Sequence, residues 1–285
     1  MINTLLAAIH WNVRPEIFSI GSFELRYYTL CFLLAFISSY VLMLHIFKRE
    51  NKPQELLDQL SIYIFLGTLL GARLGHCLFY EFDYYKDHLL EMLLPYTYVN
   101  GEFKLTGFHG LASHGGAIGI LVGIFLFCRK TKTDFLWITD RLVIVIPLAG
   151  AFVRVGNFFN SEIIGLPSDL PWAVVFEQLT QGAQVPRHPA QLYEALSYIL
   201  IFILLWNIYH RKSVLKPGYI FGIFLILLFG ARFALEFVKE NQEAFEEGMK
   251  FNMGQLLSVP FVALGVYLLF RPYPAGKQKE STARR

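Results

Sequence analysis

The chain has 285 residues, of which 55% are hydrophobic and only 16% are charged, and its formal net charge is +3. A soluble domain of this length carries about 25% charged residues, so the composition excludes an ordinary soluble domain and predicts a membrane protein. The net charge is too small to indicate nucleic acid as a partner.

The N-terminal stretch MINTLLAAIHW is apolar, but it has neither the basic segment nor the small-residue cleavage site of a secretory signal peptide. We expect residues 1–18 to form a short helix that lies at the membrane interface, capped by Trp11.

Seven further segments are apolar over about 20 residues, which is long enough for a helix to cross a ~30 Å hydrocarbon layer. They cover residues 27–47, 57–80, 112–128, 135–158, 191–209, 218–238 and 253–270. The predicted fold class is an all-α integral membrane protein, with a single seven-helix domain over residues 1–270.

Basic residues predict the orientation of these helices. Three Lys or Arg residues lie in each of three short loops, five lie in residues 271–285, and the much longer remaining loops hold only seven. Because cytoplasmic loops are enriched in Lys and Arg, we expect the N-terminus outside and the basic tail 271–285 in the cytoplasm. The longer segments 81–111 and 159–190 then lie on the outer side.

The cysteines and histidines do not indicate a metal site. Cys31, Cys77 and Cys128 are scattered and odd in number, so we expect no disulfide bond and interpret them as packing residues. His109 and His114 are five residues apart, which separates them by about 140° around a helix. They cannot be paired ligands, and we place His109 in a loop.

The glycines after His114 have two interpretations. Gly115, Gly119 and Gly123 recur every four residues, which is typical of helices that approach closely in lipid. Gly115 and Gly116 also stand at the helix N-terminus, where their backbone N–H groups would face an anion.

Polar side chains of six predicted spans fall at one depth, in the outer third of the membrane. They are Tyr28, Arg73, His76, His114, Arg154, Asn157, Asn160, Glu162, Gln191, Tyr193, Glu194, Arg232 and Glu236. A charged residue at membrane depth costs about 2.5–3.5 kcal/mol, so such groups pair or line a wet cavity. In a local interpretation, Arg232 pairs with Glu236 and the other arginines extend to the surface. We favour a shared polar cavity open to the outer leaflet, because local pairing leaves too many groups unexplained.

The segment RVGNFFNSEIIG (154–165) resembles the signature of the bacterial prolipoprotein diacylglyceryl transferase family: Arg, then Gly-Asn-Phe, Asn, Glu and a final Gly. Four more segments follow the family's order, namely GARLGHCLFY (71–80), SHGGAIG (113–119), RHPAQLYEA (187–195) and ARFALEF (231–237). The resemblance implies a multi-pass enzyme of the bacterial plasma (inner) membrane, with seven spans, an external N-terminus and an active site toward the extracytoplasmic side.

The resemblance also implies a reaction. The family moves a diacylglyceryl group from phosphatidylglycerol, a membrane lipid, to the lipobox cysteine of a prolipoprotein. It forms a thioether and releases glycerol phosphate, without a metal or cofactor.

The resemblance further implies roles for individual residues. Arg154 and Arg232 would bind the phosphate, and His114 would be the general base for the thiol. Glu162 and Glu236 would orient the arginines or transfer protons. Further functional positions that follow from the family pattern or from the shared polar depth are Tyr28, Arg73, Gly115, Gly116, Asn157 and Gly165.

The sequence departs from the family pattern at two places. Leu228 stands where the family commonly has a tyrosine, and Thr29 stands where it has a glycine. A hydroxyl missing at 228 would come from elsewhere, such as Tyr193. The alternative function is a membrane transporter with an anion-binding site near the outer face. Transporters tend to bind near the midplane between inverted repeats, whereas here the polar cluster lies to one side and no repeat is visible.

Overall fold

The computed structural model describes residues 8–21, 23–94, 96–99, 102–105, 110–179, 185–211, 216–240, 246 and 248–272. The chain divides into two compact units. We call Phe47–Ile138 the small unit, and Met1–Ile46 together with Thr139–Arg285 the large unit.

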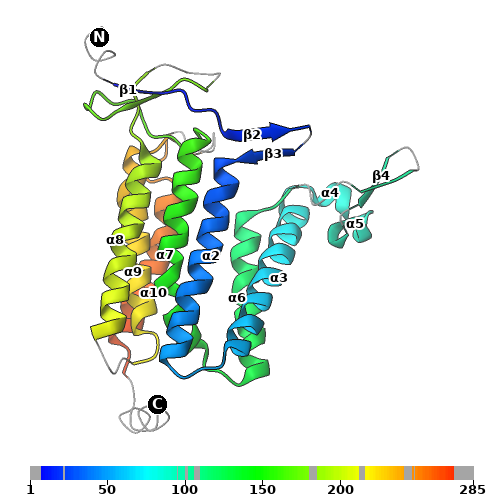
Figure 1. Cartoon of the computed structure of the whole chain (residues 1–285), viewed down its shortest axis with the longest axis vertical. Helices are drawn as coiled ribbons and strands as arrows, with labels where there is room; N and C mark the ends of the chain where they lie inside the picture. The colour runs from blue at the N-terminus through cyan, green and yellow to red at the C-terminus, as the bar shows by residue number, and fades with distance from the viewer. Residues whose placement is uncertain are drawn as a thin grey trace. The chain divides into compact units, whose positions relative to one another are not determined.

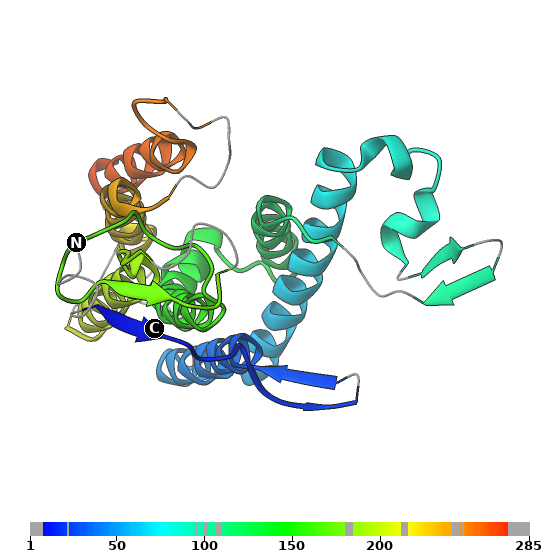
Figure 2. The ribbon, with the colours of Figure 1, turned by 90° about the horizontal axis from the view of Figure 1, so that it is seen from above.

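The large unit is built on long helices that run alongside one another. In the described chain these are α2 (Tyr27–Arg49), α7 (Phe135–Phe159), α8 (Ala190–Arg211), α9 (Tyr219–Leu235), which continues into the 3-10 turn η1 (Glu236–Val238), and α10 (Met253–Phe270). α7 lies between α2 and α8, and α9 packs on both α8 and α10 (Figures 1 and 2). The starts of α2, α8 and α10 share one end of the unit with the ends of α7 and α9 (Figure 1).

The small unit pairs two long helices and carries short elements between them in the sequence. The long helices are α3 (Gln54–Phe79) and α6 (Ser113–Thr131). The short elements are α4 (Phe82–Tyr85), α5 (Leu89–Leu93) and an antiparallel hairpin of β4 (Tyr96–Val99) and β5 (Glu102–Leu105).

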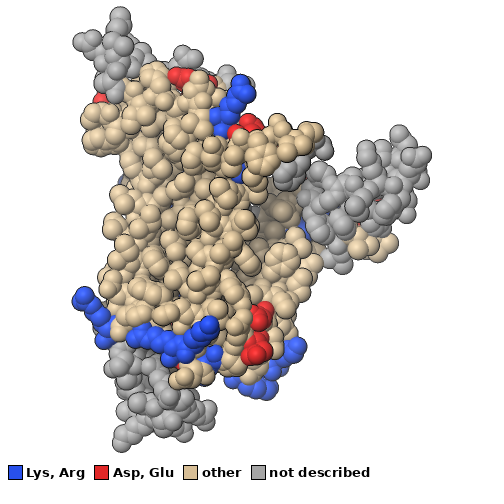
Figure 3. Space-filling view, in the orientation of Figure 1, with Lys and Arg blue, Asp and Glu red and all other residues tan. Residues whose placement is uncertain are grey.

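Six helices in the described chain are long and apolar enough to cross a membrane: α2, α3, α7, α8, α9 with η1, and α10. On the face shown in Figure 3, Lys and Arg gather at the end of the large unit where α8 ends, and its long flank shows no charged side chains. A mostly helical membrane protein is therefore confirmed. The segment predicted over 112–128 is a helix of 19 residues, α6, but it is not among the six, so its crossing stays a prediction.

The prediction of an interfacial helix over residues 1–18 is wrong for the described residues 8–18. β1 (Ile9–Trp11) pairs in parallel with β6 (Val174–Phe176), and β2 (Glu16–Ile20) pairs in antiparallel fashion with β3 (Phe23–Arg26). The described part of the expected interfacial helix over residues 1–18 is thus strand and loop.

The side chain of Trp11 explains this difference. Its ring lies 4.5 Å from that of Phe158 between centroids, and it packs on the buried cluster formed by Phe158, Val174 and Phe176. The Trp11 ring therefore packs on the end of α7 and on strand β6 after it. Residues 1–7, and residues 273–285 of the predicted tail, lie outside the described chain.

The α3–α6 pair confirms the glycine stripe as a packing feature. A Cβ atom added at Gly119 would lie 1.9 Å from the carbonyl oxygen of Gly67, and one added at Gly71 would lie 2.4 Å from that of Gly115. The two backbones therefore touch where only hydrogen fits, which is how helices associate closely in lipid.

We expect the substitution Gly119→Ala to destabilise the protein by about 1–3 kcal/mol, the usual cost of overpacking. Gly230→Ala is the matched control, because nothing lies within 4 Å of its Cβ position in α9, and alanine there favours helix by about 1 kcal/mol. Thermal unfolding of the purified variants in detergent measures both. A Gly119→Ala protein that unfolds at or above the wild-type temperature would contradict the close approach.

Candidate active site

Arg154 of α7 and Glu194 of α8 form the central ion pair of a polar cluster in the large unit. Nε of Arg154 lies 2.8 Å from Oε2 of Glu194, whose side chain is 1% exposed. Nη1 of Arg154 also donates to Oδ1 of Asn157 at 3.2 Å. A buried carboxylate without such partners would lose its hydration uncompensated. Glu194 and Asn157 together fix the direction of the guanidinium.

Glu162 is held in a strained turn after α7. Nδ2 of Asn157 donates to its Oε1 at 2.7 Å, and the side chain of Gln191 donates to its backbone carbonyl at 2.7 Å. Its neighbours Ser161 and Ile163 have φ values of 54° and 58°, a left-handed conformation that is unfavourable for a β-branched residue. Strain of this kind clusters at functional sites. Here the strained turn holds the carboxylate of Glu162, an exposed residue, against Asn157, which is also the hydrogen-bond partner of Arg154.

Two neighbouring chain segments hold this turn in place. The N–H of Gly165 donates to the carbonyl of His188 at 3.1 Å, and the N–H of Leu166 donates to that of Val238 at 2.9 Å. A Cβ atom at Gly165 would lie 2.5 Å from the His188 carbonyl oxygen and 2.8 Å from the Val238 carbonyl oxygen. This packing accounts for glycine at 165, and its substrate contact stays a prediction.

Lys239 joins two buried carboxylates of the cluster. Its Nζ lies 3.6 Å from Oε1 of Glu194 and 3.3 Å from Oε2 of Glu236, and its side chain is 3% exposed. Glu236 therefore pairs with Lys239, whereas the local interpretation pairs it with Arg232. No role was assigned to Lys239 from the sequence. Only its three-residue spacing from Glu236, typical of helical ion pairs, could have signalled this contact.

Two tyrosines border the cluster on glycines of α7. The ring of Tyr28 packs on Gly156, where an added Cβ would lie 2.9 Å from its Cδ2 atom, and the ring of Tyr198 packs on Gly150 at 3.0 Å. Tyr198 also lies within hydrogen-bonding reach of Arg154. Tyr28 was predicted from the sequence. Tyr198 was not, because it resembles any other aromatic residue of a membrane span.

Arg232 of α9 completes the cationic part of the cluster. It interacts electrostatically with Tyr198, and it makes no ion pair with any residue that the structure describes. Its charge is therefore not consumed by a neighbouring carboxylate. We use the name polar cluster for Arg154, Asn157, Glu162, Glu194, Arg232, Glu236 and Lys239.

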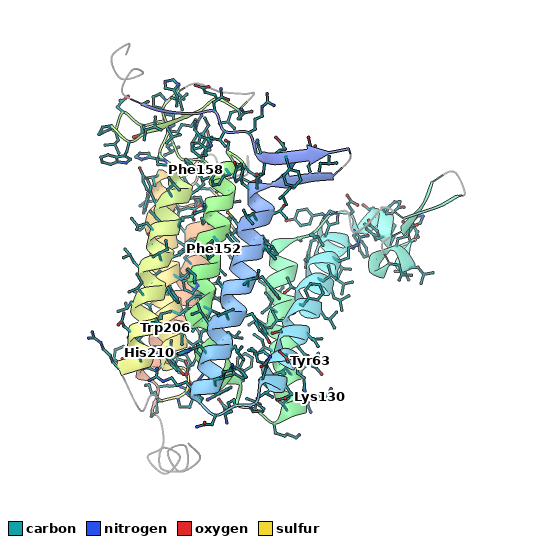
Figure 4. All side chains as sticks on the ribbon, viewed as in Figure 1. Tyr63, Lys130, Phe152, Phe158, Trp206 and His210 are labelled. Carbon is teal, nitrogen blue, oxygen red and sulfur yellow. The ribbon has the colours of Figure 1, made fainter. Side chains whose placement is uncertain are left out.

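The polar cluster gathers at one end of the helices, as the shared depth predicted for these spans. Figure 4 labels Phe158 at the end of α7 that carries the cluster, and Trp206 and His210 at the opposite end of α8. Among the described residues, no group of three or more His, Cys, Asp or Glu side chains is placed to hold a metal ion. Its three cations, Arg154, Arg232 and Lys239, stand beside two buried carboxylates, Glu194 and Glu236, and the exposed carboxylate of Glu162.

In the small unit, Arg73 has protein partners. Its Nε donates to the carbonyl of Met92 at 3.2 Å, and its Nη2 donates to the carbonyl of Glu91 at 2.7 Å and to the hydroxyl of Tyr85 at 3.1 Å. The side chain is buried. These contacts tie α3 to the α4–α5 segment and give Arg73 a structural role that its sequence context did not predict.

The predicted residues at the start of α6 separate into two kinds. His114 is exposed in the first turn and makes no hydrogen bond to another described residue. Gly115 and Gly116 instead take part in the hydrogen bonding and the packing of α6. The N–H of Gly116 donates to the carbonyl of Ala112 at 3.0 Å, so it is not free for an anion, and Gly115 packs against the backbone of α3. His109 lies outside the described residues.

These features define an integral membrane protein whose helices hold a polar, cationic cluster at one end. The family model described as prolipoprotein diacylglyceryl transferase matches residues 15–271. The chain belongs to this family, and the resemblance drawn from its sequence motifs is confirmed.

Curated relatives match over nearly the whole chain. A protein of Bacteroides fragilis is 42% identical over 271 residues, which cover 94% of this chain and 97% of the relative. One of Tolumonas auensis is 44% identical over 262 residues, covering 92% and 96%, and one of Porphyromonas gingivalis is 36% identical over 282 residues, covering 94% and 96%. All three are named phosphatidylglycerol–prolipoprotein diacylglyceryl transferase.

The bridging role of Asn157 gives a test. Asn157→Asp keeps the acceptor for Arg154 but replaces the donor to Glu162 with a second carboxylate, and two such groups repel unless they share a proton. We expect transferase activity at neutral pH to fall about tenfold or more, equivalent to about 1.4 kcal/mol, and to recover partly at lower pH. A pH–activity profile measures this.

Asn160→Asp is the matched control, because Asn160 donates to the same oxygen of Glu162 at a longer distance of 3.3 Å and is only half-buried, whereas Asn157 is buried. Its activity should change little. An Asn157→Asp enzyme with the wild-type profile would show that the bridge is not needed.

Proposed function

We propose that this chain transfers the diacylglyceryl group of phosphatidylglycerol to the thiol of the lipobox cysteine in a prolipoprotein. The observation that carries the proposal is the pair of Arg154 with the buried Glu194, together with Arg232, which makes no ion pair with a described residue. A guanidinium stays charged in a low-dielectric site and presents several donors to a phosphate. The transporter alternative is set aside, because the relatives are named as transferases.

The reaction needs no reactant beyond the two substrates. The cysteine sulfur forms a bond to the terminal glycerol carbon of the lipid, and the bond between that carbon and the phosphate oxygen breaks. Glycerol phosphate leaves with the electron pair, and the thiol proton passes to a base. A free thiol has a pKa of about 8.5, so a base that accepts its proton near neutral pH accelerates the attack.

The residues predicted from the sequence have distinct roles in this proposal. Arg154 and Arg232 bind the phosphate and stabilise the charge that grows on it, because fixed donors are most effective where charge develops. Asn157 keeps Arg154 and Glu162 in position. Glu236 acts through Lys239, its ion-pair partner. Tyr28 borders the lipid site, and His114 is the candidate base. Arg73, Gly115, Gly116 and Gly165 have structural contacts that account for them, and we propose no chemistry for them.

The proposal includes a topology in the inner membrane of a bacterium. α6 would be the seventh span, the N-terminus would lie outside, the C-terminus would lie in the cytoplasm, and the polar cluster would face the outer leaflet. The excess of Lys and Arg in the short loops supports this orientation. In the large unit, the cluster lies at the end opposite the one where α8 ends and where Lys and Arg gather (Figures 1 and 3).

The direct test supplies purified protein with phosphatidylglycerol labelled in its headgroup and with a lipobox peptide. We expect release of labelled glycerol phosphate together with a diacylglyceryl thioether on the cysteine. A peptide with serine in place of the cysteine is the control and should release nothing. Labelled lipid that stays intact in the presence of the cysteine peptide would end the proposal.

Arg232→Ala is the cleanest test of the phosphate contact. Arg232 makes no ion pair with a described residue, so its loss leaves none of the described carboxylates without a partner, and we expect the unfolding temperature to stay the same. We expect activity to fall about 100-fold or more, as when a transition-state donor is removed. Arg154→Ala should lose activity and also stability, because Glu194 loses its 2.8 Å partner. An active Arg232→Ala protein would contradict the assigned role.

The role of His114 predicts a change in pH dependence. Because His114 is exposed and has no described partner, His114→Gln should leave stability unchanged. If the imidazole accepts the thiol proton, the variant should lose the rise in rate that follows deprotonation of the imidazole, and its rate should rise only at higher pH, where hydroxide takes the proton. A variant with the same profile as the wild type would remove His114 as the base.

A further inference from the structure

We propose that Lys239 sets the charge of the phosphate site. By occupying one oxygen of Glu194, it prevents this carboxylate from neutralising Arg154, so Arg154 keeps positive charge for the lipid phosphate. The inference rests on the proposed function. Lys239 is a positioning residue, since it reaches the lipid only through Glu194 and Arg154.

The geometry divides the Glu194 carboxylate between two cations. Oε2 lies 2.8 Å from Nε of Arg154, and Oε1 lies 3.6 Å from Nζ of Lys239. The side chains of Glu194 and Lys239 are 1% and 3% exposed, so water does not substitute for either contact. Lys239 also pairs with Glu236 at 3.3 Å, which makes it the link between the two buried carboxylates.

The backbone fixes Lys239 in this position. Lys239 directly follows η1, and its backbone forms an antiparallel bridge with Gly165. The next residue, Glu240, donates its N–H to the carbonyl of Ile164 at 3.2 Å. The ammonium group is therefore held by the same chain segments that hold the strained turn of Glu162.

The charges explain why this position needs a cation. Electrostatic interactions strengthen as the effective dielectric constant falls, so a buried Glu194 paired with Arg154 alone would oppose the binding of a second anion. With Lys239 in place, the polar cluster holds three cations, Arg154, Arg232 and Lys239, against two buried carboxylates, Glu194 and Glu236, and the exposed carboxylate of Glu162. Without Lys239 it holds two cations against the same three carboxylates, and a phosphate must compete with Glu194 for Arg154.

The experiment compares Michaelis constants for phosphatidylglycerol in mixed micelles. We expect Lys239→Met to raise this KM about tenfold, equivalent to about 1.4 kcal/mol, with a smaller change in kcat. Lys239→Arg should restore the wild-type KM. In the double variant Lys239→Met with Glu194→Gln, both opposing charges are removed, and the KM should return most of the way to the wild-type value. A merely structural role predicts instead that the second substitution makes the enzyme worse.

Lys86→Met is the matched control. Lys86 also pairs with an acidic residue three positions away, Asp83, at 3.0 Å, but the two side chains are 47% and 98% exposed. Its KM should not change. If Lys239→Met does not fold, as judged by thermal unfolding, Lys239→Gln removes the charge but keeps hydrogen-bonding capacity, and the same rise in KM is expected from it.

The outcomes separate the two proposals. An unchanged KM in the folded charge-removing variant, or a double variant weaker than the single one, overturns the role of Lys239 while the transferase function stands. A wild-type protein that transfers no diacylglyceryl group overturns the function instead. In that case the dissociation constant for labelled phosphatidylglycerol is measured in place of the KM. We expect it to rank the Lys239 and Glu194 variants in the same order.

Discussion

An ion pair removed from water, Arg154 with Glu194, is the interaction on which the large unit depends. Breaking a buried pair by removing one partner costs about 3–5 kcal/mol, because an uncompensated charge remains. The pair joins α7 to α8, so both helices must keep their relative depth. Asn157 then accepts a hydrogen bond from Arg154 at 3.2 Å, and Lys239 adds a second positive charge 3.6 Å from the other oxygen of Glu194.

Small residues around this pair let bulky polar side chains reach it. Gly150 and Gly156 each receive the ring of a tyrosine from a neighbouring helix, so the tyrosines lie against the α7 backbone. In the small unit, glycines instead bring the backbones of α3 and α6 into contact. One residue type thus has two uses: it admits side chains to the polar cluster, and it closes an apolar seam.

Much of this architecture follows from the sequence, and the exceptions have physical reasons. Spans are set by runs of apolar residues, so six of the seven predicted spans match helices that are long and apolar enough to cross a membrane. The family signature supplied Arg154 and Asn157. The buried position of Lys239 could not be predicted, because it depends on carboxylates from two different helices. Strand β1 was missed because its partner β6 lies far along the chain.

The two residues beside Glu162 that adopt the left-handed conformation limit which substitutions this turn can accept. Ser161 and Ile163 hold a shape that their own preferences oppose, so the energy that maintains it comes from the segments hydrogen-bonded around them. Glycine at 161 or 163 would relax the loop locally and would also free the carboxylate to sample other directions. Stability and precision oppose each other at this turn, and natural proteins resolve such conflicts in favour of function.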